Sequence, residues 1–120
     1  MIEERLKELG IILPEAAAAV ASYLPAVQAG GLLHISGQLP FVDGELVTGK
    51  VGDTRSEDEA TAAARACGIM LIAQMKKALG SLDRVERIVK IGVFVASVPE
   101  FTGQPAIANG ASNLMADVFG

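Results

Sequence analysis

A few residues carry groups whose chemistry could serve a binding site. Tyr23, the only tyrosine, comes just before the first expected strand, where its phenol could hydrogen-bond a substrate or an attacking water molecule. Ser36 precedes Gly37, so a hydroxyl and a nearby backbone N–H could orient a carboxylate where glycine permits close approach. Asn109 could offer its amide to a ligand. The plainer alternatives are a structural tyrosine, a turn serine, and an asparagine that caps a turn or faces solvent.

Two other reactive side chains favour structural roles. His34 is the only histidine, and no nearby serine, cysteine or acid has the spacing of a catalytic triad. Cys67 is the only cysteine and falls on the apolar stripe of an expected helix, where a small buried hydrophobe is the ordinary interpretation. One histidine and one cysteine predict no zinc site and no internal disulfide. The glycines match no phosphate-binding loop and are interpreted as turns.

The composition restricts the class of protein. A chain of 120 residues is expected to form a single domain. Acidic residues outnumber basic ones, 14 to 10, the basic residues form no stripe, and the aromatic residues are few, so nucleic acid is not an expected partner. No apolar run approaches the roughly 20 residues that cross a bilayer. The first residues are charged and helical rather than signal-like, so the sequence predicts a cytoplasmic protein.

The elements that would position these residues begin with a short helix over residues 2–9, which Gly10 ends. An extended lead-in follows around residues 14–21. Residues 26–50 predict a β-meander, with a strand at 32–38 and an Asp-Gly pair at 43–44 that fits a type I′ hairpin turn.

The second half predicts two helices and a strand. Ser56 and Glu59 form a capping box for a helix over residues 57–79, and Gly80 fits its end. Residues 85–96 are rich in β-branched side chains and predict a strand. We expect its odd positions to face the long helix, namely Val85, Val89, Ile91, Val93 and Val95. Pro105 opens a last helix to about residue 118. The other sheet face is semi-apolar, as an oligomer contact or an intersubunit cleft would need.

This element order indicates an α+β sandwich with helices over one sheet face, and two stretches narrow it further. Residues 17–40 read AAAVASYLPAVQAGGLLHISGQLP, and residues 84–101 read RVERIVKIGVFVASVPEF. Both resemble signature segments of the reactive-intermediate deaminase family, the YjgF-like or Rid proteins. Asn109 also falls where that family places an asparagine. The expected N-terminal helix and the run LPEAAAAVASYLPAV look closer to a divergent bacterial branch.

The resemblance implies a chorismate-mutase-like sandwich with a mixed β-sheet, assembled as a homotrimer around a central barrel with clefts between subunits. It implies hydrolysis of reactive enamines and imines, such as 2-iminobutanoate, to 2-keto acids and ammonia, without metal or cofactor. Tyr23 would then be catalytic, and Ser36, Gly37 and Asn109 would bind substrate. A non-catalytic trimeric small-molecule-binding protein of the same fold is the alternative. An endoribonuclease or translation inhibitor ranks last because the chain is acidic.

This sequence departs from the family pattern at its C-terminal end. The family carries a carboxylate-binding arginine and a catalytic acid on strands beyond the last helix, and this sequence stops at Gly120. A sheet without its closing strands would leave an unpaired edge. We therefore expect that the sequence is truncated, rather than that the protein has lost its principal binding residue.

Overall fold

The long helix α2, Glu57–Leu79, is the element against which the others pack in the computed structural model, which describes residues 1–120. The backbone N–H of Glu59 donates to Ser56 Oγ at 3.1 Å, and the N–H of Ser56 donates to Glu59 Oε1 at 3.0 Å. The backbone hydrogen bond from Ser56, together with Arg55, holds the pKa of Glu59 below its usual value. Gly80 ends the helix with a φ of 79°. The predicted capping box and helix bounds are confirmed.

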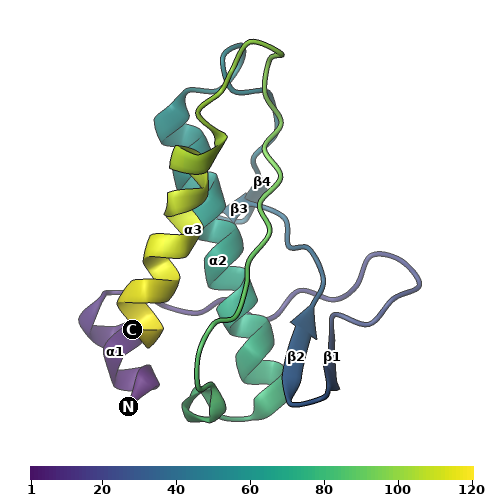
Figure 1. The fold of residues 1–120 in the computed structure, drawn as a ribbon, viewed down its shortest axis with the longest axis vertical. Helices are drawn as coiled ribbons and strands as arrows, with labels where there is room; N and C mark the ends of the chain where they lie inside the picture. The colour runs from purple at the N-terminus through teal and green to yellow at the C-terminus, as the bar shows by residue number, and fades with distance from the viewer.

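Helix α3, Gln104–Phe119, runs beside α2 in the same direction (Figure 1). Close approach depends on small residues at the crossing. A Cβ on Gly68 would lie 2.9 Å from Leu114 Cδ2, and one on Gly110 would collide with the backbone carbonyl of Thr61. The N-terminal helix α1, Ile2–Glu8, lies across the far end of α3, where Arg5 Nε donates to the Asp117 carbonyl at 2.8 Å. Both helices predicted at the ends of the chain are confirmed.

The main core lies where the three helices meet the 3₁₀ turn Leu82–Arg84. Ile72 and Leu82 are fully buried at its centre. The cluster is completed by Leu6, Ile11, Met75, Leu114, Met115 and Val118. A smaller cluster, made of Val51, Ala64 and Ile107, sits toward the other end of α2. None of the helices is both long enough and apolar enough to cross a membrane.

The strands form two separate antiparallel hairpins. Strand β1, Ala26–Ala29, pairs with β2, Leu32–Ile35, and β3, Phe41–Val42, pairs with β4, Glu45–Leu46. Asp43 and Gly44 both have positive φ, 51° and 81°, as the predicted type I′ turn requires. The α+β class is therefore confirmed. The expected single mixed sheet does not form, because both strand pairs are antiparallel and they belong to different sheets.

The strand predicted over residues 85–96 is also absent, although this segment runs the length of α2 (Figure 1). Only the two ends of the segment make backbone hydrogen bonds. The N–H of Val85 donates to the Leu82 carbonyl at 3.1 Å, and the N–H of Val51 donates to the Ala96 carbonyl at 3.0 Å. Ile91, Val93 and Val95 are half-buried, as expected for the inward face. Val89 was predicted to face inward but is 69% exposed. Ile88 packs against the main core instead, so the next residue is turned outward.

Candidate functional site

A buried glutamine on α2 organises the segment that carries Tyr23. Gln74 is only 2% exposed, and its Nε2 donates to the Ala17 carbonyl at 2.7 Å and to Gln38 Oε1 at 3.3 Å. A buried side-chain amide is costly without partners, and these contacts use both of its N–H groups. The long helix is thereby joined to the lead-in at Ala17 and to the turn after β2 at Gln38.

The turn after β2 joins the lead-in at a second point. Gln38 Nε2 donates to the Ser36 carbonyl at 2.9 Å. The Pro25 carbonyl accepts from the backbone N–H of Ser36 at 2.9 Å and from Ser36 Oγ at 3.3 Å. We call this chain of contacts, from Ala17 through Gln74, Gln38 and Ser36 to Pro25, the glutamine network. It holds the lead-in on both sides of Tyr23.

The phenol of Tyr23 is free to meet a ligand. Its side chain is 42% exposed, and its hydroxyl makes no hydrogen bond within the chain. Its backbone N–H donates to the Ala21 carbonyl at 2.9 Å, which tightens the bend at this point. Tyr23 thus combines a fixed backbone with an unsatisfied donor and acceptor, an arrangement suited to positioning a water molecule or a substrate.

Ser36 and Gly37 adjoin this segment but offer different groups. The Ser36 hydroxyl already donates to the Pro25 carbonyl, so toward a ligand its oxygen can act only as an acceptor. Gly37 is exposed, and a Cβ placed on it would have no atom within 4 Å. The chain itself therefore does not require glycine there, and the space in front of Gly37 is open to an approaching molecule.

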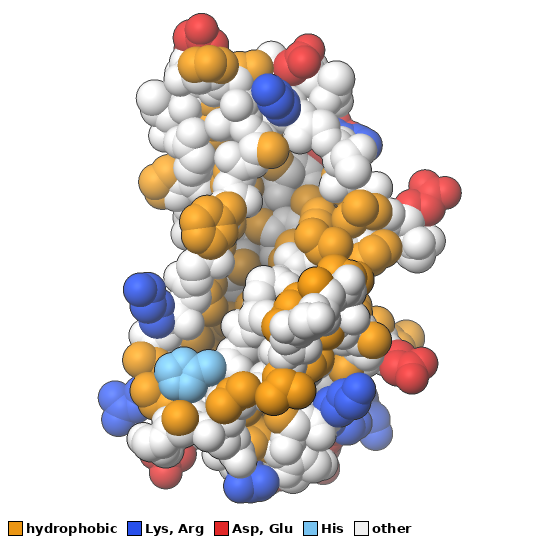
Figure 2. All heavy atoms as spheres, turned by 90° about the vertical axis from the view of Figure 1, so that its right-hand side faces the viewer, with side chains coloured by type: hydrophobic (Ala, Val, Ile, Leu, Met, Phe, Trp, Pro, Cys, Tyr) orange, Lys and Arg blue, Asp and Glu red, His pale blue; other side chains and the backbone are white.

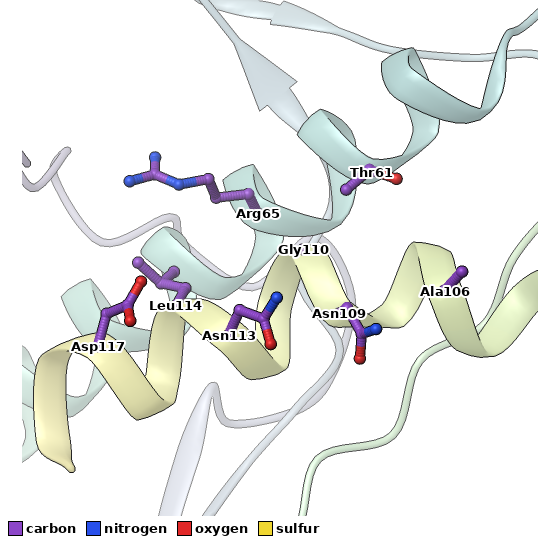
Figure 3. Close-up of a pocket in the computed structure, with 8 residues that line it drawn as sticks. All are labelled: Thr61, Arg65, Ala106, Asn109, Gly110, Asn113, Leu114 and Asp117. Atoms are coloured by element: carbon purple, nitrogen blue, oxygen red, sulfur yellow. The ribbon is translucent and has the colours of Figure 1, made fainter.

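Asn109 lies elsewhere. It lines a cavity of about 380 Å³ between α2 and α3, whereas Ser36 and Gly37 line a larger groove on the hairpin side of α2. Asn109 Oδ1 accepts from Ser112 Oγ at 3.3 Å. Figure 3 shows Asn109 and Arg65 projecting in different directions, so these two side chains do not converge on one ligand position. Within one chain Asn109 and Ser36 do not share a pocket, because Asn109 lines the cavity between the helices and Ser36 lines the groove.

The larger groove has a volume of about 1640 Å³ and includes both His34 and Cys67 in its walls. Figure 2 shows this side of the molecule, hollowed and edged with apolar side chains. His34 is exposed and has no hydrogen-bond partner that would make it a base in a triad. Burial raises the pKa of the Cys67 thiol, so its nucleophilic thiolate form is disfavoured. Both residues keep the structural interpretation.

Sequence reasoning missed the two glutamines. Gln38 stands within the ISGQ motif but was not singled out, and Gln74 interrupts an apolar run, MLIAQM, in the C-terminal half of α2. A polar residue at an otherwise buried helical position is the signal that could have identified Gln74, because such a group requires a specific partner.

We expect Gln74→Met to lower the free energy of unfolding by about 1–3 kcal/mol, because the Ala17 carbonyl and Gln38 Oε1 would lose their donor. Urea unfolding followed by circular dichroism measures this change. Gln28→Met is the matched control, since Gln28 is exposed and its side chain makes no hydrogen bond. Equal stabilities of the two variants would contradict a structural role for the network.

Three helices packed against two antiparallel hairpins place the chain in a class of small α+β proteins. Comparisons with known proteins identify the class. The family model described as "YjgF/chorismate mutase-like, putative endoribonuclease" matches residues 3–120, and the chain belongs to this family. The predicted resemblance and the chorismate-mutase-like fold are confirmed.

Individual relatives extend over nearly the whole chain. Protein TCP17 of Trypanosoma cruzi is 50% identical over 120 residues, which are 99% of this chain and 75% of that protein. The structure of protein Atu1372 of Agrobacterium tumefaciens, described as of unknown function, is 48% identical with a TM-score of 0.89, covering 99% of this chain and 74% of that one. A "putative endoribonuclease" from Shewanella oneidensis is 33% identical with a TM-score of 0.89, covering 100% and 80%.

Proposed function

We propose that this chain is the subunit of a hydrolase that deaminates reactive enamines and imines, of the 2-iminobutanoate type, to 2-keto acids and ammonia. The membership of the chain in the YjgF-like family supports this proposal at the level of the fold. The observation that carries the proposal is the Tyr23 segment, which the glutamine network fixes while leaving the phenol without a partner. Such an arrangement suits the handling of one water molecule and one proton.

The reaction asks little of the protein. Water adds to the C=N carbon of the protonated imine, the resulting carbinolamine loses ammonia as the C–N bond breaks, and the carbonyl of the 2-keto acid forms. No oxidant or reductant takes part. Because the C=N bond is already activated, positioning and proton transfer supply the needed acceleration. Tyr23 would hydrogen-bond the attacking water, and the open backbone at Gly37 would receive the substrate.

The active form in this proposal is a homotrimer with its sites between subunits. Large apolar side chains stand exposed on the side of the hairpins and the 85–96 segment away from α2. Phe94 is 99% exposed and Leu32 is 44% exposed. Exposed apolar side chains gathered on one face are typical of subunit contacts. Assembly over this face would bring residues of a neighbouring subunit toward the Tyr23 segment.

A non-catalytic small-molecule-binding protein is the second candidate, and one observation favours it. No arginine or lysine hydrogen-bonds to the glutamine network, so no cation is held in place by these residues. RNA cleavage ranks below both candidates because the chain carries a net charge of -4.

The first experiment supplies 2-iminobutanoate, generated in place by a pyridoxal-phosphate-dependent dehydratase, and follows its decay with and without the purified protein. Light scattering on the same sample gives the oligomeric state. Faster decay with release of ammonia from a trimer supports the hydrolase. Saturable binding of 2-oxobutanoate without faster decay supports the binding protein, and a monomer with neither property excludes both.

We expect Gly37→Ala to leave the free energy of unfolding within about 0.5 kcal/mol of the parent, because its Cβ would meet no atom of the chain. The KM for the imine should rise by about tenfold, since a methyl group would occupy space open to the substrate. Urea unfolding and initial rates measure the two quantities. An unchanged KM would remove Gly37 from the binding site.

A further inference from the structure

The hydrogen bonds of the glutamine network run in one direction. The Ala17 carbonyl can only accept, so it fixes which end of the Gln74 amide faces it, at 2.7 Å. The same Nε2 donates to Gln38 Oε1 at 3.3 Å, which leaves Gln38 Nε2 to donate to the Ser36 carbonyl at 2.9 Å. A reversed Gln38 amide would set donor against donor and acceptor against acceptor. Gln74 therefore determines which end of the Gln38 amide faces Ser36.

The hydrogen bond to the Ser36 carbonyl also fixes the direction of the next N–H group. The chain has no cis peptide bond, and in a trans peptide the C=O of one residue and the N–H of the next point in opposite directions. The backbone of Gly37 restrains this peptide only weakly, because glycine has no Cβ. The contact from Gln38 therefore sets where the N–H of Gly37 points.

The burial of Gln74 indicates a role beyond stability. Gln74 is 2% exposed, and its neighbours Ile72, Ala73 and Met75 are buried as well. A buried amide is a weak source of net stability, because it gives up hydrogen bonds to water to make those within the protein. A satisfied buried network instead specifies one arrangement of its members. The arrangement that Gln74 specifies includes the turn that carries Gly37.

We propose that Gln74 is a positioning residue for the part of the site that binds the substrate carboxylate. Through Gln38 it holds the N–H of Gly37 in the direction from which this group donates to the carboxylate of a 2-imino acid. Such a hydrogen bond to a charged acceptor is stronger than one between neutral groups. Gln74 itself does not touch the substrate. The inference rests on the proposed hydrolase function, which places the substrate at Gly37.

The first test follows the N–H of Gly37 without substrate, by nuclear magnetic resonance of isotope-labelled protein. Gln74→Met and Gln38→Met should both displace the Gly37 amide resonance, since each breaks the chain of hydrogen bonds that ends at the preceding carbonyl. Gln28→Met is the control, because Gln28 is exposed and its side chain makes no hydrogen bond. An unmoved Gly37 resonance in both glutamine variants overturns the proposal, whether or not the protein is a hydrolase.

The second test separates positioning from stability, at a temperature where every variant is folded. The KM for the imine should rise about tenfold in Gln74→Met and in Gln38→Met, while kcat changes by less than about twofold, because the carboxylate contact holds ground state and transition state alike. Val118→Ala is the matched control. It shortens a buried side chain of the main core, so it should lower the free energy of unfolding and leave KM unchanged.

A KM that stays at the parent value in both glutamine variants overturns the proposal. A KM that rises as much in Val118→Ala also overturns it, since instability alone would then explain the effect. A parent protein without turnover counts against the hydrolase function instead, and the Gly37 resonances then decide by themselves whether Gln74 orients this peptide.

Discussion

Replacing Tyr23 by phenylalanine is expected to lower kcat/KM for imine hydrolysis by about 100-fold, the lower end of what a positioned acid–base group contributes. The Tyr23 hydroxyl makes no hydrogen bond within the chain, so its removal leaves no buried group unsatisfied. The backbone contacts that hold the segment, at Ala17 and Pro25, do not involve the phenol. Initial rates of ammonia release, with light scattering to establish the assembly, measure the effect.

Ser22→Ala is the matched control for this variant. Ser22 is the exposed neighbour of Tyr23, and its hydroxyl makes no hydrogen bond within the chain. Its removal should leave both the rate and the assembly unchanged. If Tyr23→Phe keeps full activity as a trimer, the phenol has no part in the reaction, and Tyr23 returns to the structural interpretation.

Gly110→Ala is expected to lower the free energy of unfolding by about 2–3 kcal/mol through overpacking. A Cβ at this position would collide with the backbone carbonyl of Thr61, and a carbonyl within α2 cannot turn aside as a side chain can. The two helices would have to separate along the crossing that supports both core clusters. Alanine favours the helix by about 1 kcal/mol over glycine, which offsets only part of the cost. Urea unfolding measures the difference.

Gly68→Ala provides the comparison at the same crossing. Its Cβ would lie 2.9 Å from Leu114 Cδ2, the movable end of a flexible side chain. A small rotation of Leu114 relieves that contact, so the gain of about 1 kcal/mol in helix propensity should nearly cancel the loss. If Gly68→Ala proves as destabilising as Gly110→Ala, the rigid carbonyl is not the cause.

Features whose partners lie a few residues apart were readable from the sequence. The capping box of Ser56 and Glu59, the Asp43–Gly44 turn and the end of α2 at Gly80 all match their predictions. Each depends on a local conformational preference or on one hydrogen bond within four residues. The family signatures also pointed to the correct fold, which the comparisons confirm.

Of the candidate site, the sequence singled out Tyr23, Ser36 and Gly37. Ser36 and Gly37 line the groove at the end of β2, and Ser36 contacts Pro25, whereas Tyr23 is not among the groove-lining residues. Asn109, by contrast, faces a different cavity of the same chain. A helix pattern identifies which side of α3 is apolar, but the direction of an exposed residue relative to a distant turn depends on how the helices cross.

The remaining features were decided by tertiary structure alone. The segment 85–96 has strand-like composition, yet it forms no strand, because a β-strand exists only where another strand supplies hydrogen bonds. Gln74 joins separate parts of the chain only because the fold brings Ala17 and Gln38, which are far away in sequence, within hydrogen-bonding distance of its amide. The sequence by itself determined the local elements and the family. Long-range contacts decided which backbone remained unpaired and which polar groups met, since no short window of residues encodes them.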